Sequence, residues 1–138
     1  MSERMVHANN VDLCTESFGE ASNPAVLLIM GATASMVWWD DEFCRRLAGE
    51  GRFVLRYDHR DTGRSVTYEP GTINYTIDDL ADDAAAVLDA YQRAHAQSVG
   101  MSWGGLLAQL LALRHPHRVQ RLTLMMAMGN SICQGERP

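Results

Sequence analysis

One five-residue pattern constrains the fold of this chain more than any other, because it requires a strand before it and a helix after it. Gly100-Met101-Ser102-Trp103-Gly104 fits G-x-S-x-G. A short β-prone run from Ala96 precedes it, and an apolar, helix-like run over 106–113 follows it. In such a strand-turn-helix the serine sits on a sharp turn, where a side chain at position 100 or 104 would clash. We therefore predict that Ser102 lies between a strand and a helix.

The composition indicates one globular domain over residues 1–138 that does not bind nucleic acid. The chain is 46% apolar and has a formal net charge of −5 at pH 7. A chain of this length can bury a core. A nucleic-acid-binding face would require a basic patch, whereas the twelve basic residues, all arginine, are scattered along the sequence.

The cysteines and the apolar runs predict a cytoplasmic protein. Cys14, Cys44 and Cys133 lie far apart without metal-like spacing, which predicts free thiols in a reducing compartment. The N-terminus leads into no apolar signal segment, and the longest apolar runs are shorter than a membrane span. We expect no metal, no cofactor and no membrane partner.

Strands and helices alternate along the chain after an initial hairpin around Asn9-Asn10. The strands are expected at 4–7, 11–18, 25–30, 53–57, 96–99 and 122–126, and the helices at 37–48, 76–91 and 103–114. The polar tail over 129–138 is expected to fray. Alternation of this kind predicts an α/β fold, a mostly parallel sheet with helices on both faces.

The polarity pattern also predicts which faces are buried. Segment 11–18 alternates apolar and polar residues, which suits a half-exposed antiparallel hairpin at the sheet edge. Segment 37–48 places Trp39, Phe43 and Leu47 on one face, and segment 103–114 is apolar nearly all round, so it should be deeply packed. On helix 76–91 the solvated side is expected to carry four acids: Asp78, Asp82, Asp83 and Asp89.

Four landmarks in this order resemble the N-terminal half of an α/β-hydrolase. They are Met30-Gly31 after the third strand, the run over 58–65 after the fourth, the Ser102 turn (the nucleophile elbow of that family) and the sixth strand. The run over 57–65 and the N-terminal residues 1–4 are particularly similar to aclacinomycin methylesterase-like esterases. These enzymes hydrolyse a methyl ester on a polyketide antibiotic.

The resemblance implies a strand order of 1-2-4-3-5-6, with strand 1 antiparallel, and a serine carboxylic-ester hydrolase acting on a small-molecule ester. Ser102 would be the nucleophile, and the backbone N–H groups of Ala32 and Trp103 would form the oxyanion hole. Gly31-Ala32 is alternatively a tight turn. Trp103 is larger than the residue often found there and is expected to crowd the acyl pocket.

Other residues near these strand ends have two interpretations. Asp58 is either a functional carboxylate or an acceptor for the amides of its own turn, where Arg60 and Arg64 would help to hold the loop. Trp38 and Trp39 are interpreted as core or pocket wall rather than as a specific ligand site.

The sequence does not contain a histidine at the position where the family has its catalytic base. In the family, the acid and the histidine follow the sixth strand, and this sequence stops at Pro138. We therefore expect a truncated core without the cap and strands 7 and 8. His95 lies roughly 20 Å from Ser102, at the opposite end of the same strand. Only His59 lies at the correct edge, as a possible substitute base or as a solvated turn histidine.

Two interpretations of function follow. The chain is an esterase, as a fragment or completed by a partner chain, or it is a catalytically incompetent remnant or ligand-binding module of the same fold. Strand 6 would be an exposed apolar edge, which predicts pairing with a second copy or a complementary chain. A nucleotide-binding domain is disfavoured, because no G-x-G-x-x-G or G-x-x-x-x-G-K-[ST] follows the first parallel strand.

Overall fold

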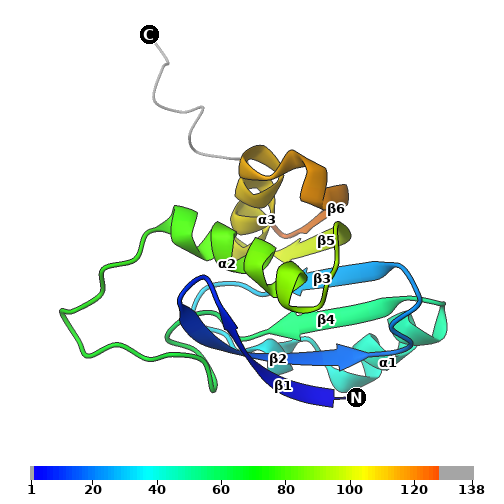
Figure 1. Cartoon of the computed structure of the whole chain (residues 1–138), viewed down its shortest axis with the longest axis horizontal. Helices are drawn as coiled ribbons and strands as arrows, with labels where there is room; N and C mark the ends of the chain where they lie inside the picture. Colours follow the sequence, from blue (N-terminus) through cyan, green and yellow to red (C-terminus); the bar gives the residue numbers. More distant parts are fainter. Residues whose placement is uncertain (1, 128–138) are drawn as a thin grey trace, which may run out of the picture.

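The computed structural model describes residues 2–127 as one six-stranded sheet with helices on both of its faces (Figure 1). The strand order is β1-β2-β4-β3-β5-β6, so the predicted fold class and order are confirmed. The elements are β1 (Ser2–Ala8), β2 (Val11–Phe18), β3 (Ala25–Ile29), η1 (Met36–Trp38), α1 (Asp41–Gly49), β4 (Phe53–Tyr57), α2 (Ile77–Ala90), β5 (Ala96–Met101), α3 (Trp103–Arg114), η2 (Pro116–Arg118) and β6 (Val119–Met125).

The strand that runs against the others in the described sheet is β2, so the expectation for strand 1 is wrong. β2 pairs antiparallel with both β1 and β4, whereas β3 to β6 pair in parallel. Figure 1 shows the β2 arrow opposite to those of β3 and β4. Asn9 and Asn10 form the hairpin turn with φ of 50° and 65°, which turns the chain back after β1. β1 therefore shares the common direction.

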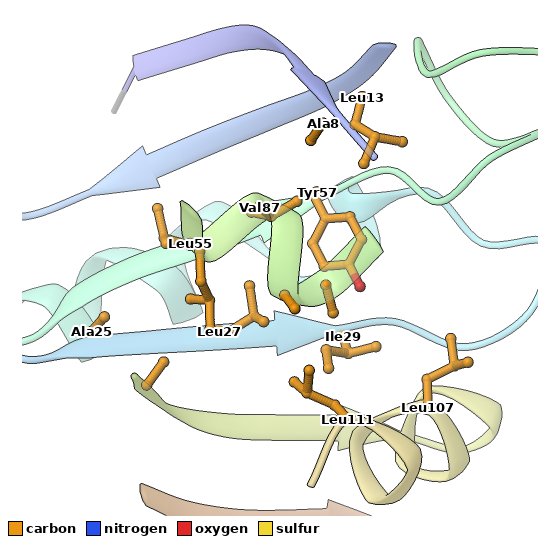
Figure 2. Packing of buried hydrophobic residues seen from close by; sticks show 14 of the residues in the cluster. Ala8, Leu13, Ala25, Leu27, Ile29, Leu55, Tyr57, Val87, Leu107 and Leu111 are labelled. Atoms are coloured by element: carbon orange, nitrogen blue, oxygen red, sulfur yellow. The ribbon is translucent and has the colours of Figure 1, made fainter. Parts of the chain in front are cut away.

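Successive residues of β3 pack into different layers of core. Leu27 and Ile29 face α2 and α3, whereas Val26 and Leu28 face α1. Full burial of each such side chain contributes about 1.5–3 kcal/mol. Figure 2 shows the first of these layers, in which side chains of the strands meet those of the helices: Leu27, Ile29, Leu55, Tyr57, Val87, Leu107 and Leu111.

Capping residues decide where two helices begin. The expected helix at 37–48 is a short 3-10 turn followed by α1, because the Asp40 side chain accepts from the Glu42 amide and restarts the helix. A capping box of Thr76 and Asp79 starts α2, with both reciprocal hydrogen bonds present.

Two burial expectations are wrong. The hairpin of β1 and β2 lies at the edge of the sheet as expected, but β2 is not half-exposed, because it lies between β1 and β4 and its Glu16 is buried against Arg56 of β4. Asp83 is not on the solvated side of α2, because it is buried against Arg60. The α3 helix is deeply packed as expected, except at its end, where Leu113 is exposed.

Cys14 and Cys44 are buried free thiols, and burial raises the pKa of each to about 11. Cys133 and the tail over 129–138 lie outside the described residues. Among the helices of residues 2–127, none combines the length and the apolar character needed to cross a membrane.

Candidate active site

Ser102 occupies a strained turn between β5 and α3. Its backbone has φ 55° and ψ −120°, a conformation that side chains rarely adopt. A serine at a helix N-cap normally accepts a hydrogen bond from the first turn, yet the Ser102 side chain makes none. The residue is exposed at the N-terminus of α3, where the helix dipole favours negative charge. The hydroxyl is thus presented to solvent and is not used to cap the helix.

The glycines of the motif allow this turn to pack against neighbouring backbone. A Cβ on Gly104 would lie 2.2 Å from the Ile29 carbonyl oxygen, and one on Gly100 would lie 2.4 Å from the Gly104 carbonyl oxygen. Such separations are impossible without a backbone shift. The Ser102 amide also donates to the Met125 carbonyl oxygen at 2.8 Å, which ties the turn to the end of β6. The predicted strand-turn-helix around Ser102 is confirmed.

The loop after β3, which we call the oxyanion loop (Gly31–Ser35), lies directly against this turn. A Cβ on Gly31 would be 3.6 Å from the Ser102 Cβ and 3.9 Å from the Trp103 nitrogen. Ala32 is exposed at the tip of the loop. Within the described part of the chain, the amides of Ala32 and Trp103 have no hydrogen-bond partner. The two amides predicted to form an oxyanion hole therefore belong to adjoining segments and are free to donate.

His59 is buried, so the interpretation as a solvated turn histidine is wrong. Its Nε2 lies 2.8 Å from the Met30 carbonyl oxygen. A carbonyl oxygen only accepts, so Nε2 carries the proton and Nδ1 does not. Burial lowers the pKa of the imidazole, and the bond to Met30 only partly opposes this shift. The structure shows no hydrogen bond between His59 and Ser102, the contact that a substitute base would use.

Asp58 has the structural role expected of a turn aspartate, and a second one that the sequence did not indicate. Its Oδ2 accepts from the Arg64 amide at 3.0 Å, within its own loop. Its Oδ1 accepts from the Met36 amide at 2.7 Å, at the far end of the oxyanion loop. The second bond joins segments 22 residues apart, and no local pattern marks it.

The two neighbouring tryptophans have different environments. Trp39 is buried in the layer beneath α1, as expected of a core residue. Trp38 is exposed and lines a shallow pocket with Val37, Asp40 and Asp41. Within residues 2–127, no three metal-ligating side chains gather closely enough to hold an ion.

The fold and the elbow agree with a family model described as the alpha/beta hydrolase fold, which matches residues 24–134. The chain belongs to this family. It is 48% identical to the rhodomycin D methylesterase DauP of Streptomyces sp. (strain C5) and 46% identical to the rhodomycin D methylesterase DnrP of Streptomyces peucetius. Each match covers 91% of this chain and 42% of the relative, so the chain spans less than half the length of either.

A solved structure supports the same assignment. Epoxide hydrolase A from Mycobacterium thermoresistibile matches with a TM-score of 0.81 and 30% identity, over 89% of this chain and 38% of that one. The resemblance to methylesterases of this fold is thereby confirmed.

Proposed function

We propose that this chain carries the nucleophile and the oxyanion hole of a carboxylic-ester hydrolase, acting on a methyl ester of a small molecule. The observation that carries the proposal is the strained, exposed Ser102 beside two unpartnered amides. The similarity to rhodomycin D methylesterases supports the substrate class.

The chemistry follows from this geometry. The Ser102 Oγ attacks the ester carbonyl carbon, and the carbonyl oxygen becomes an oxyanion that the Ala32 and Trp103 amides stabilise. Collapse of the tetrahedral intermediate releases methanol and leaves an acyl-serine, which water then hydrolyses. A base must take the serine proton in the first step. No histidine of residues 2–127 hydrogen-bonds to Ser102. The base is therefore supplied by another residue or by a partner chain.

A covalent serine probe tests the nucleophile. The purified chain is incubated with a fluorophosphonate, and modification of Ser102 is measured by peptide mass spectrometry. Labelling that Ser102→Ala abolishes would support an activated nucleophile. If a full-length rhodomycin D methylesterase is labelled under the same conditions and this chain is not, the result favours the alternative, a ligand-binding module of the same fold.

We also propose that a second polypeptide strand, from a second copy or a complementary chain, pairs with β6. This strand lies at the end of the described sheet, its Leu122 and Leu124 are 39% and 43% exposed, and Met126, which follows it, is 85% exposed. Exposed apolar edges of this kind favour pairing with another chain. Sedimentation equilibrium should show a dimer that Leu124→Lys dissociates, and a monomer at every concentration tested would contradict self-association.

A further inference from the structure

The oxyanion loop is held at both ends by two consecutive residues that follow β4. At its start, the His59 Nε2–H donates to the Met30 carbonyl oxygen at 2.8 Å. At its end, the Asp58 Oδ1 accepts from the Met36 amide at 2.7 Å. Both residues are only 3% exposed. Among the described residues, no hydrogen bond ties positions 31–34 themselves to a different segment, so these two flanking bonds hold the loop.

We propose that Asp58 and His59 are positioning residues that fix the oxyanion loop, and with it the Ala32 amide, relative to Ser102. This inference rests on the proposed function, because it assigns the Ala32 amide to the oxyanion hole. It assigns the two side chains no contact with substrate. They act through the backbone on either side of the loop.

The two residues are themselves well anchored, as a positioning role requires. The second carboxylate oxygen of Asp58 accepts from the Arg64 amide, and its backbone carbonyl oxygen accepts from Ser65 Oγ at 2.6 Å. Ser65 Oγ in turn accepts from the Cys14 amide of β2 at 2.9 Å. The oxyanion loop is thereby connected through buried groups to β2 and β4, which are hydrogen-bonded neighbours within the sheet.

The His59 ring also contacts the residue that supplies the other oxyanion amide. It packs edge-to-face against Trp103, with ring centroids 6.3 Å apart, and against Tyr57 at 5.1 Å. One side chain therefore touches both segments whose amides must converge on the same oxygen atom. Removal of one oxyanion donor costs about 10²–10³ in rate, so a small displacement of this loop should be measurable.

A cysteine at position 102 tests this inference without requiring a catalytic base, since a thiol is partly ionised near neutral pH. The Ser102→Cys variant is made in a Cys133→Ser background. Its thiol is acylated with p-nitrophenyl acetate, a reaction that forms an oxyanion, or alkylated with iodoacetamide, which forms none. Peptide mass spectrometry gives both rates at position 102, and their ratio reports on the oxyanion hole alone.

His59→Phe keeps a ring between Tyr57 and Trp103 but removes the donor, whereas His59→Gln places an amide N–H near the position of Nε2. We expect His59→Phe to lower the ratio of acylation to alkylation at least tenfold, and His59→Gln to restore most of it. His7→Phe, on the exposed hairpin, is the matched control and should leave the ratio unchanged. An unchanged ratio in His59→Phe, or an equal loss of both rates, would overturn the proposal.

Amide hydrogen exchange separates this outcome from failure of the proposed function. If the parent Ser102→Cys protein shows no higher ratio than a cysteine peptide, the oxyanion hole itself is absent. The positioning role is then judged by exchange at the Met36 amide, which is hydrogen-bonded in the parent protein, in Asp58→Ala and in His59→Phe. Faster exchange at this amide, with β1 and β2 unchanged, supports it, and unaltered exchange contradicts it.

Discussion

The guanidinium of Arg60 and the carboxylate of Asp83 form two parallel hydrogen bonds, of 2.8 Å from Nε and 2.9 Å from Nη2, with side chains only 8% and 2% exposed. The bond to Asp83 raises the pKa of Arg60. Asp83 also accepts from Asn9 Nδ2 at 2.9 Å. This carboxylate thus connects the hairpin turn, α2 and the loop that contains Asp58 and His59. Through Arg60 it holds the loop from which those two residues contact the oxyanion loop.

Removal of one partner of this pair should be costly, because it leaves an uncompensated buried charge. We expect Asp83→Ala to lower the free energy of unfolding by about 3–5 kcal/mol. Asp89→Ala, on the same helix, is the control. Its carboxylate is exposed and pairs with Arg118 at the surface, so the cost should stay below about 1 kcal/mol. Urea unfolding followed by circular dichroism measures both values.

The double variant Arg60→Met/Asp83→Leu sharpens this prediction. Two apolar side chains leave no unpaired charge, so the double variant should recover most of the loss seen in Asp83→Ala. A double variant no more stable than Asp83→Ala would show that the polar contacts of the pair, rather than its buried charge, account for the cost.

The close approach at Gly104 gives a second prediction. A Cβ there would overlap the backbone oxygens of Ile29 and Met30, at 2.2 and 2.5 Å, so β3 or the elbow must shift. We expect Gly104→Ala to destabilise the protein by about 3 kcal/mol or more. Gly49→Ala is the matched control, since a Cβ at the end of α1 would meet nothing within 4 Å. It should leave stability unchanged or raise it slightly. Equal melting temperatures for the two variants would contradict the close packing of the elbow.

The positions of the strands and the elbow could be predicted from sequence because both depend on local signals, whereas the strand order was implied by the resemblance to α/β-hydrolases. Apolar runs, helical periodicity and the spacing of Gly100, Ser102 and Gly104 are all readable within about ten residues. The contacts of the buried polar side chains could not be predicted in this way. Arg56 lies within a strand of apolar neighbours, and its partners Glu16 and Asp41 are 40 and 15 residues away. Such pairs form only once the sheet has brought distant segments together.

The burial of His59 could not be predicted from its sequence neighbours either. A histidine that follows an aspartate in a polar loop resembles a solvated turn residue, and its sequence neighbours give no sign of burial. Burial follows from Tyr57 and Trp103, which cover its ring, and from the Met30 carbonyl oxygen, which accepts its proton-bearing nitrogen. Proximity along the chain predicted the edge of the sheet on which His59 lies, but not what it contacts there.

The buried imidazole makes stability depend on pH. Burial lowers the pKa of His59 below its ordinary value of 6.5, so the unfolded state takes up a proton at a higher pH than the folded state. The free energy of unfolding should therefore fall as pH drops below about 6.5, by up to about 1.4 kcal/mol per pH unit from this group. His59→Gln should lose this contribution, whereas the exposed His7→Gln should keep it. Urea titrations at about pH 7.5 and pH 5.5 measure how much the free energy of unfolding of each variant changes with pH. An equal change in His59→Gln and His7→Gln would show that His59 is not the group responsible.

The backbone strain at Ser102 predicts opposite effects on stability and on chemistry. Glycine adopts a φ of 55° with a ψ of −120° at little cost, whereas any side chain there costs about 1–3 kcal/mol. Ser102→Gly should therefore be more stable than Ser102→Ala by about 1 kcal/mol, after allowance for the greater freedom of glycine in the unfolded chain. Both variants lack the hydroxyl and should fail to react with a fluorophosphonate. Thermal melts compare the two, and an alanine variant as stable as the glycine variant would show that the turn is unstrained. The same strained turn keeps the hydroxyl out of the helix cap and exposed to solvent.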